Sequence, residues 1–136
     1  MGVAAALAEQ RLGADAADIA ALRDRLETQL VSIDGVTLNA VGAPRSPKHL
    51  NVSVAGVDGE ALLVGLDTTG VAVSAGSACA AGSLEPSHVL VAMGLNRQQA
   101  RSSVRLSLGR GVTAAMVDAA AQRFAEVVAR CRAFAA

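Results

Sequence analysis

The sequence predicts an α+β fold in which a small antiparallel or mixed sheet of about four strands packs against helices. Segments with the period-two alternation of strands are interspersed with segments whose apolar residues recur at spacings of three and four, as in amphipathic helices. The links between these segments are short. A chain of 136 residues with this pattern is expected to form one core.

One helix and two strands are predicted in the first part of the chain. Residues 15–31 carry an apolar stripe at helical spacing. Residues 36–41 alternate as a strand after the break at "SIDG". Residues 49–54, "HLNVSV", form a half-buried strand whose polar face carries His49, Asn51 and Ser53.

The central segment predicts a capped helix followed by a strand. Asp58 can accept backbone N–H bonds at the start of a helix over residues 59–67, and Gly70 ends it. A short strand is predicted over residues 71–74, "VAVS".

Two brief helices are predicted before the last strand. Pro86 opens the first, which runs through Met93 and is closed by Gly94. Asn96 followed three residues later by Gln99 has the spacing of a capping box and starts the second.

The last strand and last helix complete the predicted core. In "SVRLSL" (103–108) the apolar residues point inward, which leaves Arg105 and Ser107 on the opposite face. Thr113 is expected to cap a long final helix with a continuous apolar stripe formed by Val117, Ala121, Phe124, Val128 and Cys131.

Charge and hydropathy exclude several classes of partner. Twelve basic residues balance twelve acidic ones and are scattered, so neither nucleic acid nor a membrane surface is an expected partner. The N-terminus lacks the basic region of a signal peptide, and no apolar run approaches the roughly 18–20 residues of a membrane span. We therefore expect a cytoplasmic protein with reduced thiols.

The two cysteines lie in different settings. Cys131 falls on the apolar stripe of the final helix and is predicted to be structural. Cys79 lies in "VAVSAGSACAAGSLEPSHVL", where Gly76 and Gly82 bracket "SACAA" and predict a loop that can swing. Either Cys79 is incidental on a surface loop, or it is a nucleophile that needs a cationic or helix-terminal neighbour to ionise. The candidate neighbours are Arg105, His88 and the helix at Pro86.

Arg105 and the two histidines leave further alternatives. Arg105 is either an ordinary exposed strand residue or a forked anchor for a carboxylate or phosphate. His49 and His88 have no second ligand at a metal-binding interval, so no metal site is indicated.

Three quoted segments carry a family resemblance. "NVSVAGVDGEALL", "GVAVSAGSACAAGSLEPSHVL" and "SSVRLSLGR" resemble, in this order, signatures of the cysteine desulfurases, which are pyridoxal-phosphate enzymes of the class-V aminotransferase family. The resemblance implies the small domain of a fold-type I enzyme over residues 35–136, with residues 1–34 as N-terminal linker helices.

The resemblance implies a role for both candidate site residues. Cys79 matches the family cysteine that takes sulfur from L-cysteine as a persulfide, leaving L-alanine, and Arg105 matches the arginine that binds the substrate carboxylate. A moving loop would let Cys79 carry sulfur to an acceptor, such as an iron–sulfur cluster assembly protein.

The family lysine that holds pyridoxal phosphate has no counterpart here. Lys48, the only lysine, lies in "SPKHLN" and does not match that motif. We therefore expect no cofactor on this chain alone, and a large cofactor-binding domain as a partner in cis or in trans. Two alternatives are a non-catalytic module that docks sulfur acceptors and an unrelated domain with a coincidental loop.

Overall fold

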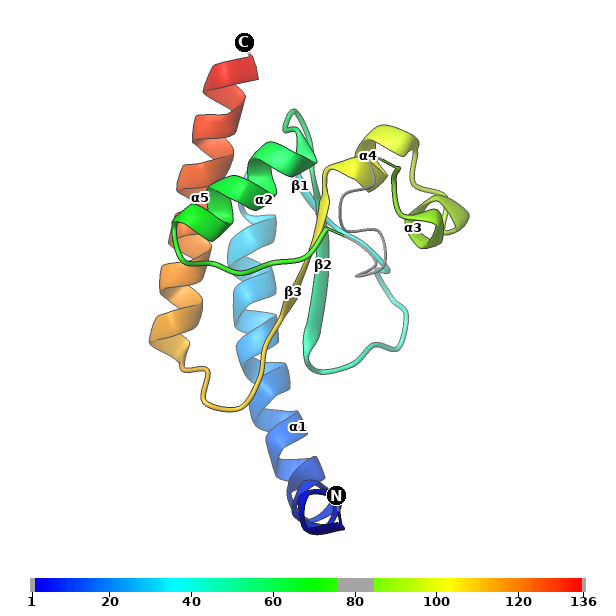
Figure 1. Ribbon diagram of the computed structural model, residues 1–136, viewed down its shortest axis with the longest axis vertical. Coiled ribbons are helices and arrows are strands. Elements are labelled where there is room, and N and C mark those ends of the chain that lie inside the picture. Colours follow the sequence, from blue (N-terminus) through cyan, green and yellow to red (C-terminus); the bar gives the residue numbers. More distant parts are fainter. Residues whose placement is uncertain (1, 76–84, 136) are drawn as a thin grey trace.

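The sheet lies between two unequal groups of helices in the computed structural model, which describes residues 2–75 and 85–135 (Figure 1). Within those ranges the sheet has three antiparallel strands in the order β1-β2-β3, formed by Val36–Leu38, His49–Val54 and Ser103–Ser107. The helices are α1 (Gly2–Val31), α2 (Gly59–Thr68), α3 (His88–Ala92), α4 (Arg97–Arg101) and α5 (Ala114–Ala135). The predicted α+β class is confirmed.

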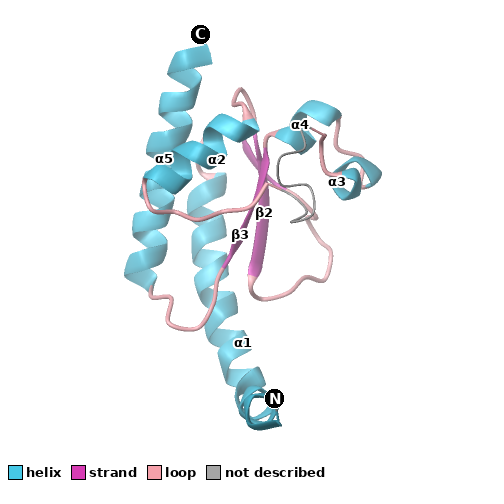
Figure 2. Ribbon diagram, in the orientation of Figure 1, coloured by secondary structure: helices cyan, strands magenta, loops and turns pink. Residues whose placement is uncertain are grey.

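The long helices cover one side of the sheet and the short helices lie on the other. Helices α1 and α5 run side by side, and α2 packs on α5 (Figure 2). Helices α3 and α4 lie near one end of the opposite side, where α4 contacts β2. The sheet therefore has one face closed along its length and one face covered mainly at one end.

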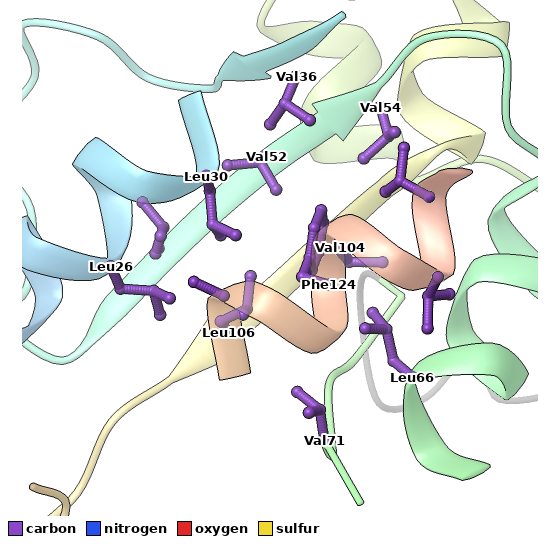
Figure 3. Packing of buried hydrophobic residues seen from close by; sticks show 14 of the residues in the cluster. Leu26, Leu30, Val36, Val52, Val54, Leu66, Val71, Val104, Leu106 and Phe124 are labelled. Atoms are coloured by element: carbon purple, nitrogen blue, oxygen red, sulfur yellow. The ribbon is translucent and has the colours of Figure 1, made fainter. Parts of the chain in front are cut away.

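The core lies between the sheet and the long helices (Figure 3). Phe124 of α5 is fully buried among the apolar side chains of the strands and of α2, including Val52, Val104 and Leu66. Cys131, predicted on the same stripe, packs against this core but is only half-buried. The aliphatic composition thus builds one continuous core.

The predicted helix starts are confirmed at three positions. The Asp58 carboxylate accepts from the backbone N–H groups of Glu60 and Ala61, each at 3.0 Å. Asn96 and Gln99 form a complete capping box at α4. The Thr113 hydroxyl accepts from the N–H of Met116 at 3.3 Å. Each bond satisfies a backbone group that the first turn leaves unpaired.

Three element boundaries differ from the sequence prediction. The strand predicted over residues 36–41 ends at Leu38, because Ala40 takes a left-handed φ of 59° and turns the chain. The helix predicted from Pro86 begins at His88, with Ser87 as its N-cap residue. The helix predicted over residues 15–31 and the linker helices expected within residues 1–34 form one continuous helix, α1, that begins at Gly2.

The predicted fourth strand, residues 71–74, is not a strand in the structure. The N–H of Val71 bonds back to the carbonyl of Leu66 at 2.9 Å, so this backbone closes the end of α2 instead of joining the sheet. Pairing is reduced to a single antiparallel bridge between Ser74 and Arg105.

Candidate functional site

The polar face of the sheet is arranged in rows set by the strand register. His49 pairs with Ser107, Asn51 with Arg105, and Ser53 with Ser103. Paired residues point to the same face of a sheet with Cβ atoms about 4.5–5.5 Å apart. Exposure differs between these rows. Ser53 and Ser103 are 4% and 2% exposed, Asn51 and Arg105 are half-buried, and His49 and Ser107 are exposed.

Arg105 lies at the centre of this polar face. Among residues 2–75 and 85–135, its buried Nε atom has no hydrogen-bond partner and no carboxylate pairs with its guanidinium. A buried N–H that has lost its water and gained no partner is costly. The arrangement is therefore suited to an anion supplied from outside the described residues.

A hydrogen-bonded network lies beside Arg105. Asn39 Nδ2 donates to Asn51 Oδ1 at 2.6 Å, and the Ser53 hydroxyl donates to Asn39 Oδ1 at 3.0 Å. The Ser53 and Ser103 hydroxyl oxygens are 2.8 Å apart, and Ser103 donates to the carbonyl of Gln99 in α4 at 2.6 Å. The network joins β2, β3 and Asn39, which directly follows β1, to α4.

The bridge to Ser74 brings a distant segment to Arg105. The Ser74 N–H donates to the Arg105 carbonyl at 3.0 Å, and the Arg105 N–H donates to the Ser74 carbonyl at 2.7 Å. Cys79 follows Ser74 by five positions in the sequence and lies outside the described residues. The structure thus places Arg105 but does not test the prediction for Cys79.

The remaining candidate residues lie apart from this row or have ordinary contacts. His49 Nδ1 is 2.9 Å from the Ser107 hydroxyl at the exposed edge, and His88 is exposed in α3. In the part of the chain that the structure describes, no group of three His, Cys, Asp or Glu side chains could hold a metal ion. Lys48 is exposed in the loop before β2.

A shallow hollow of about 640 Å³ lies elsewhere, between the loop before α2 and helix α4. Arg97 and Arg101 line it, together with Asp58, whose carboxylate is already occupied by the α2 cap. Arg105 does not line this hollow. Among the described residues that line the hollow, the Asp58 carboxylate and the Ser102 hydroxyl are both engaged by helix ends, so we place the candidate site on the polar face of the sheet.

The sequence predicts a site at Arg105 but gives no role to the residues around it. It indicates a polar strand face for Asn51 and Ser53 and does not single out Asn39 or Ser103. Their signal was the matching alternation of "HLNVSV" and "SVRLS", but only the register shows that Asn51 and Arg105 are opposite each other.

The class of protein follows from comparison with known families. Residues 1–120 match the family described as aminotransferase class-V. The chain belongs to this family.

No helix among the described residues is long and apolar enough to cross a membrane.

Particular relatives narrow the comparison. The chain is 45% identical over 132 residues to a cysteine desulfurase IscS of Pseudomonas putida and 47% identical over 133 residues to one of an Anaeromyxobacter species. Each alignment covers 97% of this chain and 32% of the relative. The structure is similar to a NifS-like protein of Rickettsia africae, with a TM-score of 0.80, 28% identity, and coverage of 93% of this chain and 32% of that one. The chain spans about a third of the length of these relatives.

Proposed function

We propose that this chain is part of a cysteine desulfurase, in which Arg105 binds the carboxylate of L-cysteine and Cys79 accepts its sulfur. The observation that carries the proposal is the bridge between Arg105 and Ser74. Cys79 follows Ser74 by five positions in the sequence, so the bridge ties the start of the segment that carries Cys79 to the strand that carries Arg105.

The proposed transfer conserves atoms and electrons. The Cys79 thiolate attacks the sulfur of the substrate, a sulfur–sulfur bond forms, and the substrate carbon–sulfur bond breaks. The electron pair of the broken bond stays on the carbon side, which takes up a proton to give L-alanine. Cys79 is left as a persulfide that passes its outer sulfur to an acceptor, such as an iron–sulfur cluster assembly protein.

The chain does not fit a role as sole holder of pyridoxal phosphate. Its single lysine, Lys48, is exposed in the loop before β2 and does not match the family's cofactor motif. We propose that a large cofactor-binding domain, in cis or in trans, supplies that chemistry. Mixed with pyridoxal phosphate, the chain alone should give no stoichiometric, borohydride-trappable adduct at Lys48, and mass spectrometry of the digested protein would detect one.

We also propose that residues 1–34 link the cofactor-binding domain to a small domain over residues 35–136. The first half of α1 projects from the rest of the described structure (Figure 1). It exposes apolar side chains that a neighbouring domain would cover: Val3 is 78% exposed and Leu12 is 70% exposed. The proposed boundary falls in the turn after α1, just before β1.

The proposal is tested by restoring the missing part. The chain is fused to the remaining part of the Pseudomonas putida relative, loaded with pyridoxal phosphate, and assayed for alanine released from L-cysteine. Cys79→Ser should abolish persulfide formation, whereas Arg105→Ala should mainly raise KM. Arg123→Ala, an exposed arginine of α5, is the matched control and should leave both unchanged.

Two results would contradict the proposal. One is a Cys79→Ser fusion that releases sulfur at the parental rate. The other is an Arg105→Ala fusion with the KM of the Arg123→Ala control. A fusion whose Cys79→Ser variant still binds an acceptor protein, with no alanine released by the parent, would favour the non-catalytic docking module.

A further inference from the structure

The residue opposite Arg105 on the neighbouring strand carries an unused hydrogen-bond donor. From this we infer that Asn51 is a second anchor for the carboxylate that Arg105 binds, and that the network behind it sets the orientation of its amide. The inference rests on the proposed function for the identity of the ligand, an α-amino acid carboxylate. It adds a substrate-binding residue that the sequence prediction did not contain.

The orientation of the Asn51 amide follows from the order of donors in the network. Ser103 donates its only hydroxyl proton to the carbonyl of Gln99, so its oxygen accepts from Asn39 Nδ2 at 3.4 Å and from Ser53. The single Ser53 proton lies between Ser103 Oγ and Asn39 Oδ1, which both accept from it. The amide nitrogen of Asn39 is thereby turned toward Asn51 and donates to its Oδ1 at 2.6 Å. Reversing the Asn51 amide would place two N–H groups against each other, so the network holds it in one orientation.

This orientation leaves the Asn51 nitrogen as a free donor. Among the described residues, no hydrogen bond from Asn51 Nδ2 is present, and its oxygen is already occupied by Asn39. Asn51 is the register partner of Arg105, and both side chains are half-buried on the same face. An amide and a guanidinium therefore extend from neighbouring positions on one face of the sheet, within reach of one small ligand.

The donor set selects the charge of the ligand. Amide nitrogen and guanidinium offer hydrogens and no acceptor, and no described Asp or Glu forms an ion pair with Arg105. A planar carboxylate can take two parallel bonds from an arginine and a third from a neighbouring donor. An aspartate at position 51 would itself pair with Arg105 and occupy the site. An amide instead offers a donor to the ligand and leaves the guanidinium available.

The test uses the whole 136-residue chain, labelled with ¹⁵N, and acetate as the probe. The Arg105 Nε–H and Asn51 side-chain NH₂ resonances are followed by NMR as sodium acetate is added, against sodium chloride at equal ionic strength. Both should shift in a saturable way with one shared midpoint. Arg105 shifts alone, different midpoints, or no saturable shift at either residue would each overturn the inference.

Variants test the same point independently. Asn51→Ala should weaken acetate binding about three- to tenfold, as expected for the net contribution of one hydrogen bond at a half-buried site. Asn51→Asp should abolish it, since the new carboxylate competes. Thr37→Val, on the exposed β1 position opposite Ser53, is the matched control and should keep the parental midpoint. An Asn51→Ala variant that folds and binds acetate with the parental midpoint would overturn the inference.

The kinetic arm separates this inference from the proposed function. In the fused enzyme described above, Asn51→Ala should raise KM for L-cysteine with little change in kcat. If that enzyme releases alanine but Asn51→Ala leaves KM unchanged, the second anchor is wrong and the desulfurase function stands. If acetate binding depends on Asn51 but the parent fusion releases no alanine, the anion site stands and the function is wrong.

Discussion

The two faces of the same sheet differ in how evenly they are covered. On the apolar face, side chains from both paired strands are 0–5% exposed along their whole length, as shown by Leu50, Val52, Val104 and Leu106. On the polar face, coverage falls from the buried Ser53–Ser103 row under α4 to the exposed row of His49 and Ser107. Arg105 lies midway along this gradient.

This difference separates stability from recognition within one pair of strands. The apolar face is sealed by α1 and α5 and contributes the hydrophobic free energy of folding. The polar face buries enough hydroxyl and amide groups to fix their geometry, yet leaves the next row accessible to a ligand. Because strand side chains alternate, one strand can pack the core with one face and present polar groups to a ligand with the other.

The largest expected effect is the loss of packing on the apolar face. Phe124→Ala removes a fully buried ring and should lower the free energy of unfolding by about 3–5 kcal/mol, measured by urea denaturation. Phe134→Ala, which removes the same ring from a position that is 86% exposed, is the control and should change it by less than about 0.5 kcal/mol. Equal losses of unfolding free energy in Phe124→Ala and Phe134→Ala would show that the apolar face of the sheet does not supply the stability assigned to it.

The next effect tests the close packing of α2 on α5 behind that face. A Cβ at Gly65 would lie 2.7 Å from Val127 Cγ1, and Val127 is fully buried and cannot withdraw. Gly65→Ala should therefore lower the free energy of unfolding by about 1–3 kcal/mol, measured by urea denaturation, despite the better helix propensity of alanine. Gly13→Ala in α1 has nothing within 4 Å and should stabilise by up to about 1 kcal/mol. Stabilisation by both changes would contradict the tight contact.

A smaller effect is expected from the buried row of the polar face. Ser53→Ala removes the donor to Asn39 Oδ1 and should lower the free energy of unfolding by about 1–2 kcal/mol. It should also release the Asn39 and Asn51 amides, visible as broadened or averaged side-chain NH₂ resonances. Thr37→Val, at the exposed register partner of Ser53, provides the comparison and should leave both readouts unchanged. Sharp, unshifted amide resonances in Ser53→Ala would show that the network does not orient them.

The smallest effect lies outside both faces, at an exposed pair that joins α1 to α5. Arg25 donates two bonds to Asp118, at 2.7 and 2.8 Å, and Gln29 donates a third, which lower the pKa of Asp118 from 3.8 to about 2. The unfolded chain therefore takes up this proton first as the pH falls, so the contribution is full above about pH 4 and disappears near pH 2. Asp118→Asn should flatten the acid limb of the stability curve slightly over that window. An unchanged slope would show that the pair contributes nothing.

The sequence by itself determined the parts of this protein that depend on local chemistry. The helix caps at Asp58, Asn96 and Thr113 follow from side chains that bond to backbone within three residues, and the apolar stripe of α5 follows from helical periodicity. The sequence likewise predicts the polar face of "HLNVSV" and the position of Arg105 on a strand, and it carries the family resemblance. The prediction that Cys79 carries sulfur comes from that resemblance and still awaits its test.

Only the tertiary structure decided which of these residues meet. Asn39, Asn51, Ser103 and Arg105 are separated by up to 66 positions, and nothing local specifies the register that puts Asn51 opposite Arg105 and Ser74 beside it. That register is set by the packing of the apolar face, since a slip of one residue would turn every buried valine and leucine of β2 and β3 to the other side. The predicted strand at residues 71–74 is reduced to one bridge for a different reason, because the N–H of Val71 bonds to the carbonyl of Leu66 at the end of α2 and is not available to the sheet.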